Sequence, residues 1–380
     1  MAEITTYKYY LAGNDLDRLI QQIASQGYQV FGPRKRDSAI VYDEIRGSAD
    51  LPRGWKDEQA GGHYRLETTN DQSYFSHTVG PDSWKRFIFS PRETIFKVKM
   101  TADGMRFFEP VVDEGKRAFF GIRSCELSAI SVQDRVLIES DYKDHSYAAR
   151  RKDLLFVAVN CTRSAATCFC ASLDTGPRAR GNFDLSLTEV IDRDVHYFSM
   201  EIGSENGRKI AEPLALEKIS LEHQTAAETA NASAAVQQRG INPERIRDLS
   251  RANIDNTEFW RQLEDRCLSC GNCTMVCPTC FCSNVLEETS LDGSESSRVR
   301  QWDSCFNFSH SHLAGGTSVR SSGASRYRQW FTHKLSSWHD QFGTSGCIGC
   351  GRCITWCPVG IDITEEAGRL ESESQGRTNT

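Results

Sequence analysis

Two short stretches in the first half of the chain are continuously apolar. Residues 118–122 and residues 154–159 contain no polar side chain, the pattern of strands buried on both faces of a parallel sheet. Residues 127–137 lie between them and are expected to form the crossover helix. A further strand is expected at residues 39–42, and a hairpin at residues 183–200. Together these patterns predict mixed α/β structure.

An amphipathic helix is expected near the start of the chain. Leu16, Ile20 and Ile23 recur at helical spacing, so they define one apolar face. Asn14 is the expected N-cap of this helix, and Gly27 marks its end.

The second half of the chain is expected to be mainly helical. Residues 211–240 are rich in Ala, Glu and Gln, and a helix containing Phe259, Trp260 and Leu263 leads into Cys267. The predicted fold class is therefore α+β, with an N-terminal mixed α/β domain followed by a largely helical domain. The predicted units are residues 1–210, a helical connector at 211–255, and residues 256–380.

Composition narrows the class of protein. The chain has 380 residues, of which 39% are hydrophobic and 25% charged, with a formal net charge of −6. This composition is typical of a globular protein, and the acidic balance argues against nucleic acid as a partner. No apolar run is long enough to span a bilayer. Residues 1–8 lack the basic and apolar regions of a secretory signal, so a cytoplasmic location is expected.

The chain contains 15 cysteines. The expected reducing compartment disfavours disulfides, so these residues are better candidates for metal or cluster ligands. They fall into two groups, from Cys125 to Cys170 and from Cys267 to Cys357, with none between.

The second group contains the same motif twice. Residues 267–278 and residues 347–358 both have the form C-x2-C-x2-C-x3-C-P. In ferredoxins with two [4Fe–4S] clusters, three cysteines of such a run bind one cluster and the fourth binds the other. The first predicted ligand set is Cys267, Cys270, Cys273 and Cys357. The second predicted ligand set is Cys347, Cys350, Cys353 and Cys277.

Structural zinc is the alternative for these runs, because zinc sites also use C-x2-C pairs. Zinc needs only four ligands and gives no reason for two complete runs, so clusters are favoured. Pro278 and Cys347 are separated by a long insertion. This insertion is expected to make the domain helical and to bury the clusters in a larger shell.

A third set of four cysteines lies in the first half of the chain. Cys125 and Cys161 each follow a predicted strand, and Cys168 and Cys170 form a C-x-C pair on the next loop. Adjacent parallel strands end at the same edge of a sheet, where ligands bind in open α/β folds. Three interpretations stay open: a third iron–sulfur cluster, which is favoured, a zinc site, or packing of small buried side chains.

Three cysteines remain outside these sets: Cys280, Cys282 and Cys305. Packing beside the clusters is the favoured interpretation, although a histidine such as His310 or His312 could complete a ligand set. A local excess of basic residues in the insertion favours a solvated face, with compensation of anionic clusters or partner docking as alternatives. Its members are Arg298, Arg300, Arg320, Arg326, Arg328 and Lys334.

No catalytic constellation is readable from the sequence. There is no G-x-G-x-x-G after a strand and no G-x-x-x-x-G-K-[ST], so no dinucleotide or nucleotide site is assigned. No catalytic residue is assigned either.

The chain resembles the beta subunit of cytosolic sulfhydrogenase-type [NiFe] hydrogenases and the related iron–sulfur subunit of anaerobic sulfite reductase. The resemblance rests on long-range motifs over most of the chain. They include residues 121–127, 168–170 with 176–177, 277–282, 302–305, 326–328, 333–334 and 349–353.

The resemblance implies an electron-transfer protein with two [4Fe–4S] clusters. Within a larger complex, it relays single electrons between a catalytic subunit of hydrogenase type and a flavin- and NAD(P)-binding subunit. Alternatives are a relay subunit of sulfite-reductase type, a stand-alone reductase with a non-standard cluster at Cys125–Cys170, and a zinc-stabilised binding module.

Overall fold

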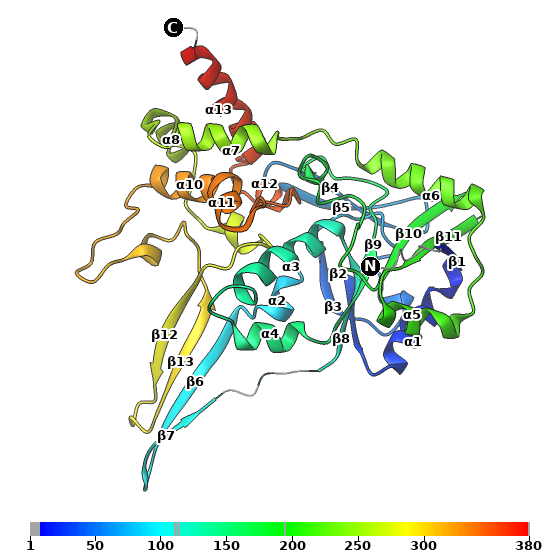
Figure 1. Cartoon of the computed structure of the whole chain (residues 1–380), viewed down its shortest axis with the longest axis horizontal. Helices are drawn as coiled ribbons and strands as arrows, with labels where there is room; N and C mark the ends of the chain where they lie inside the picture. The colour runs from blue at the N-terminus through cyan, green and yellow to red at the C-terminus, as the bar shows by residue number, and fades with distance from the viewer. Residues whose placement is uncertain (1–7, 110–111, 113–114, 194, 379–380) are drawn as a thin grey trace.

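The computed structural model describes residues 8–109, 112, 115–193 and 195–378, with helices and sheets in both halves of the chain (Figure 1). The architecture is α+β, as predicted. The expectation about a secretory signal concerns mostly residues 1–7, which lie outside the described residues.

A seven-stranded sheet organises the first half of the chain. Its order is β1-β11-β10-β9-β8-β2-β3, and β2, β8, β9 and β10 run parallel. The strands are β1 (Lys8–Ala12), β2 (Gln29–Arg36), β3 (Ala39–Glu44), β8 (Arg117–Ile122), β9 (Leu154–Val159), β10 (Leu185–Asp192) and β11 (Val195–Ile202). The predicted strands at residues 39–42, 118–122 and 154–159 and the predicted hairpin β10–β11 are confirmed.

Helices cover both faces of this sheet, which explains the apolar runs. On β8, Ala118 and Phe120 pack into the core that contains helix α1 (Leu16–Ser25), while Phe119 and Ile122 pack into the core under α3 (Ser124–Leu137). The first face also contacts α5 (Glu205–Ala211), and the second face contacts α2 (Lys85–Ile88) and α4 (His145–Arg151).

Helix α1 begins one residue later than expected. Residues Gly13–Asp15 form a 3₁₀ turn, so Asp15 rather than Asn14 is the N-cap. Asn14 therefore lies inside the turn instead of capping the helix. Gly27 follows the helix with a φ of +83°, as expected of a residue that ends it.

A second sheet projects from the body of the molecule (Figure 1). Its order is β12-β13-β6-β7, from β6 (Arg92–Thr101), β7 (Gly104–Phe108), β12 (Ser283–Thr289) and β13 (Glu295–Trp302). The insertion between the two cysteine runs therefore begins with a hairpin, in addition to the expected helices. The strands of this hairpin, β12 and β13, are mainly polar, so they lack the apolar alternation that predicts a strand.

Helices dominate the remainder of the second half. They are α6 (Leu221–Ala234), α7 (Pro243–Ala252), α8 (Thr257–Glu264), α9 (Asn272–Met275), α10 (Gly323–Thr332), α11 (Trp338–Phe342), α12 (Arg352–Thr355) and α13 (Ile363–Thr378). Phe259, Trp260, Tyr327, Trp330 and Phe331 form the aromatic centre of a core to which α7, α12 and α13 also contribute.

The connector helix α6 lies against β10 and β11, and it buries only small or polar side chains, Ala227, Asn231 and Ala234. The unit boundaries at residues 210 and 255 stay predictions.

A short hairpin joins the two halves. It consists of β4 (Trp55–Ala60) and β5 (His63–Thr68), and its turn residue Gly62 donates a hydrogen bond to the carbonyl of Ile354 in α12. Short 3₁₀ turns occur at Ser48–Asp50, Cys170–Leu173, Glu212–Leu214 and Phe308–Ser311, and a π-helical turn occurs at His333–Ser337. Within the described residues, no helix is both long and apolar enough to cross a membrane.

Candidate functional site

The two cysteine runs adopt the same local structure. Gly271 and Gly351 have φ values of +76° and +77°, and each begins a single helical turn, α9 or α12. A side chain at Gly351 would meet the backbone of Thr167 at 2.5 Å. Glycine therefore allows the left-handed backbone at both positions and the close approach of the loop at Gly351.

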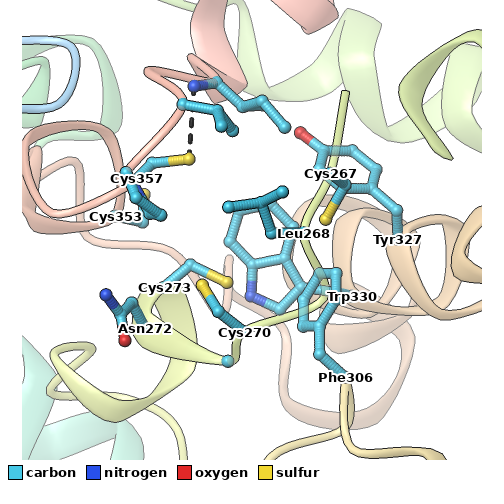
Figure 2. Close-up of a pocket in the computed structure, with 14 residues that line it drawn as sticks. Cys267, Leu268, Cys270, Asn272, Cys273, Phe306, Tyr327, Trp330, Cys353 and Cys357 are labelled. Carbon is cyan, nitrogen blue, oxygen red and sulfur yellow. Dashed lines mark hydrogen bonds between the residues drawn. The ribbon is translucent and has the colours of Figure 1, made fainter. Parts of the chain in front are cut away.

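The first predicted ligand set surrounds one pocket (Figure 2). Cys267, Cys270 and Cys273 approach from the first run, and Cys357 approaches from the end of the second. Cys353, a member of the second predicted set, also lines this pocket. Backbone N–H groups point at two of the thiols, because Ser269 N donates to Cys267 Sγ at 3.4 Å and Ile361 N donates to Cys357 Sγ at 3.3 Å.

Apolar side chains form the wall of this pocket. Leu268, Phe306, Tyr327, Trp330 and Ile361 line it. Burial raises the pKa of Cys273, and the neighbouring Cys267 and Cys357 raise it further. Soft thiol donors, N–H groups directed at sulfur and an apolar shell fit an iron–sulfur cluster.

The thiols of the second predicted ligand set also lie close to one another. Burial raises the pKa of Cys353, and the neighbouring Cys347 and Cys350 raise it further, followed by Cys277. Cys277 also acts on the pKa of Cys347 and of Cys350. The fourth cysteine of the first run therefore lies among the first three of the second.

A buried lysine accompanies this second set. Lys334 Nζ donates to Cys277 Sγ at 3.3 Å and to the hydroxyl of Thr279 at 2.9 Å, and the side chain is buried. The neighbouring Cys277 and Cys280 raise the pKa of Lys334 against the effect of its burial. The lysine therefore supplies positive charge beside the thiols.

The four cysteines of the first half also lie together. Cys125 is in the first turn of α3, directly after β8, and Cys161 follows β9. Burial raises the pKa of Cys168, and the neighbouring Cys170 and Cys161 raise it further. Cys125 and Cys170 also pack in one buried cluster.

This third set borders the second. Cys350 packs in the same buried cluster as Cys125 and Cys170. Gln237 Nε2 donates to Cys170 Sγ at 3.2 Å, and Arg123 Nη1 lies 3.8 Å from Cys161 Sγ. Nothing in the sequence singled out Gln237, because it reaches Cys170 only through the fold of the connector.

Comparison with known proteins agrees with this geometry. Residues 266–361 match the model of a family described as the 4Fe-4S dicluster domain. The chain is 30% identical over 348 residues to sulfhydrogenase 2 subunit beta of Pyrococcus furiosus, an alignment that covers 90% of this chain and 95% of the relative. The chain belongs to the family of that subunit. No solved structure gives a significant match.

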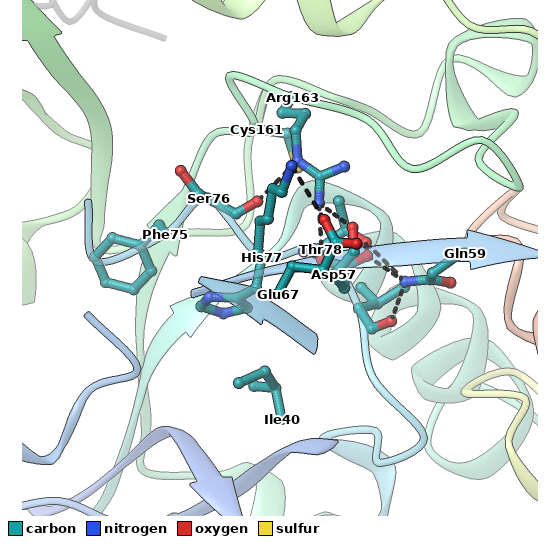
Figure 3. Close-up of polar contacts among 12 residues, drawn as sticks. Ile40, Asp57, Gln59, Glu67, Phe75, Ser76, His77, Thr78, Cys161 and Arg163 are labelled. Carbon is teal, nitrogen blue, oxygen red and sulfur yellow. Dashed lines mark hydrogen bonds and ion pairs between the residues drawn. The ribbon is translucent and has the colours of Figure 1, made fainter. Parts of the chain in front are cut away.

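In this member of the sulfhydrogenase beta-subunit family, a buried polar network links the loop after β9 to the second cysteine run. Figure 3 shows the part of the network around Asp57. The Asp57 carboxylate accepts hydrogen bonds from Thr78 and Gln59, and it pairs with Arg163 at 3.0 Å. Gln59 Oε1 then accepts a hydrogen bond from the hydroxyl of Thr355 in α12 at 2.7 Å. The network therefore ties the loop of the third set to the second cysteine run.

The three remaining cysteines gather beside the second set. Cys280, Cys282 and Cys305 line one cavity together with His310 and Lys334. His312 is absent from this lining. Within the described part of the chain, no three His, Cys, Asp or Glu side chains meet closely enough to hold a single metal ion.

The expectation of a solvated basic face is wrong for three of its members. Arg300 pairs with Glu93 at 2.7 Å in a largely buried site, and Arg326 donates to the carbonyls of Arg320 and Ser321. Lys334 is buried beside the thiols. The partners of Arg300 and Lys334 come from distant parts of the chain, and those of Arg326 from the preceding turn, whereas Arg298 remains exposed.

Proposed function

We propose that this chain is an electron-relay subunit that binds two [4Fe–4S] clusters through crossed sets of cysteines. Cys267, Cys270, Cys273 and Cys357 would bind one cluster, and Cys347, Cys350, Cys353 and Cys277 the other. The observation that supports this proposal best is the position of the two crossing cysteines. Cys357 lines a pocket with the first three cysteines of the first run, which Cys353 also borders, and Cys277 acts on the pKa of Cys347, Cys350 and Cys353. When bound, each cluster supplies one-electron redox chemistry.

We propose that Cys125, Cys161, Cys168 and Cys170 bind a third iron–sulfur cluster. Their convergence at the edge of the seven-stranded sheet and the contact between Cys350 and Cys125 support it. The three sites would then form a row, with the second set in the middle. A row with two ends suits a protein that accepts an electron from one partner and passes it to another.

The partners follow from the same proposal. The chain would connect a flavin- and NAD(P)-binding subunit with a catalytic subunit, in the cytoplasm. The similarity to a protein named as a sulfhydrogenase subunit favours a hydrogenase-type partner over a sulfite-reducing one. The units at residues 1–210 and 256–380 would hold the third site and the dicluster site respectively.

Metal and sulfide analysis of the anaerobically purified full-length chain tests this proposal. Two clusters require about eight iron and eight sulfide per chain, and three clusters require about twelve of each. A content of about eight iron and eight sulfide per chain would contradict the third cluster and leave the other two in place. Zinc without iron would overturn the relay in favour of a binding module. Co-purification from the native host, with identification of the other subunits, tests the partners.

A further inference from the structure

Two cysteines outside all three ligand sets are held together at the base of a hairpin. Cys282 precedes β12 and Cys305 follows β13, and the pairing of Ser283 with Trp302 closes the hairpin between them. The N–H of Asp303 also donates to the carbonyl of Cys282 at 2.9 Å. Both side chains line the same cavity. The hairpin therefore brings the two thiols to one place.

These thiols face a cavity of about 230 Å³. His310 lines this cavity, and its Nδ1 lies 2.6 Å from Oδ2 of Asp303. Because the carboxylate orients the ring, the imidazole can hold or release a proton beside the thiols. Lys334 lines the same cavity and bonds to Cys277, so the cavity adjoins the second ligand set.

The two thiols differ in acidity. The neighbouring Cys305, together with His310 and Lys334, lowers the pKa of Cys282 to about 6. The neighbouring Cys282 and burial raise the pKa of Cys305 above its usual value. Cys282 is therefore the more acidic of the two thiols, an asymmetry found in redox-active cysteine pairs.

We propose that Cys282 and Cys305 form a redox-active dithiol that converts reversibly to a disulfide. Reduction breaks the S–S bond with two electrons, and each sulfur that ends as a thiol takes up one proton; oxidation reverses each step. This inference rests on the proposed function, because the electrons come one at a time from the iron–sulfur clusters of the dicluster domain. Lys334 joins the pair to the second set, and Cys273 of the first set also acts on Cys305.

The pair would give the relay a two-electron store. A cluster accepts one electron, whereas a nicotinamide or a flavin exchanges two. A dithiol beside the second set would hold one electron pair, with protons passing through His310 and the cavity.

Thiol mapping of the full-length, iron-loaded chain tests this proposal. Samples are poised with dithionite or with an oxidising mediator, alkylated with iodoacetamide, and analysed as non-reduced peptides. The expected result is a Cys282–Cys305 disulfide in the oxidised sample and two alkylated cysteines in the reduced one. A redox titration should take up two more electrons per chain than the same titration of Cys282→Ala or Cys305→Ala.

Iron content distinguishes a redox-active pair of cysteines from a pair of cluster ligands. Both alanine variants should keep the iron content of the parent chain, and Cys280→Ala, the matched control, should keep the disulfide. A chain that holds its iron but forms no disulfide at any potential overturns the dithiol alone. Loss of iron from Cys282→Ala and Cys305→Ala would make them ligands and also overturn it. A parent chain without iron would overturn the relay itself.

The pH dependence of alkylation gives a second readout. Cys282 should reach its full reactivity in the reduced chain above about pH 7, because its pKa is about 6. In Cys305→Ala the influence of the neighbouring thiol is gone, so the reactivity should keep rising toward the ordinary thiol range near pH 8.5. Identical profiles in the two chains would show that the thiols do not interact.

Discussion

Arg352 and Glu126 form a fully buried ion pair, with 2.7 Å between Nη2 of the arginine and Oε1 of the carboxylate. Their side chains are 0% and 1% exposed. Glu126 lies in α3, beside Cys125 of the third set, and Arg352 lies in α12, between two cysteines of the second. Tyr42 completes the site by donating its hydroxyl to Glu126 at 2.6 Å. The pair therefore fixes the second and third sets relative to each other.

Removing one partner of this pair should destabilise the chain strongly. Arg352→Met leaves the Glu126 carboxylate buried without a cation, which costs about 3–5 kcal/mol in comparable sites. The thermal midpoint of the iron-loaded chain should fall by several degrees, as measured by circular dichroism. Arg261→Met is the matched control, because its pair with Glu258 is exposed and its loss should leave the midpoint unchanged. Equal midpoints for the two variants would contradict the structural role of the buried pair.

Replacement of Cys277, the cysteine of the first run that is assigned to the second ligand set, tests both ligand sets. Cys277→Ser should perturb the cluster assigned to Cys347, Cys350 and Cys353, although these residues are distant in sequence. Electron paramagnetic resonance of the reduced chain can resolve the two signals, with Cys347→Ser as the reference for damage to the same cluster. If Cys277→Ser instead reproduces the spectrum of Cys267→Ser, the assigned crossing is wrong.

The buried lysine should raise the reduction potential of the cluster that Cys277 binds. Reduction adds a negative charge, and a unit positive charge about 4 Å away contributes up to about 4 kcal/mol at an effective dielectric constant near 20. Lys334→Met should therefore lower that potential, by roughly 100 mV, in a titration monitored by electron paramagnetic resonance. Lys334→Arg keeps the charge and should stay close to the parent value. A potential that is unchanged in Lys334→Met would show that the lysine has only a packing role.

Loss of one cysteine from the third set should lower the iron content of the full-length chain. Cys168→Ala removes one of four thiols at the sheet edge, so the chain should lose about four iron and four sulfide. Cys280→Ala is the control, since Cys280 lies outside all three sets. The full chain is required, because Gln237 and Cys350 complete the surroundings of this site. Unchanged iron in Cys168→Ala would mean that these cysteines only pack.

Features encoded by local pattern could be predicted from the sequence, and features created by distant contacts could not. The apolar runs at β8 and β9 predicted two neighbouring buried strands, and the position of Cys125 and Cys161 after them anticipated their convergence. The polar strands β12 and β13 could not be predicted because they have no apolar alternation, and β13 pairs with β6, a strand distant in the sequence. Likewise, the cationic side chain of Lys334 predicted solvation, whereas the fold surrounds it with thiols. Lys85 was missed for the same reason, as it donates to the carbonyls of Cys277 and Cys280.

The most direct test of the relay is the choice of electron donor. The purified, flavin-free chain is titrated anaerobically, first with dithionite and then, in a fresh sample, with NADPH or NADH, while visible absorbance is recorded. We predict reversible bleaching of the cluster absorbance by dithionite and no bleaching by either nicotinamide, because each cluster accepts single electrons and no nicotinamide motif is present in the sequence. Rapid reduction of the flavin-free chain by NADPH would contradict the account.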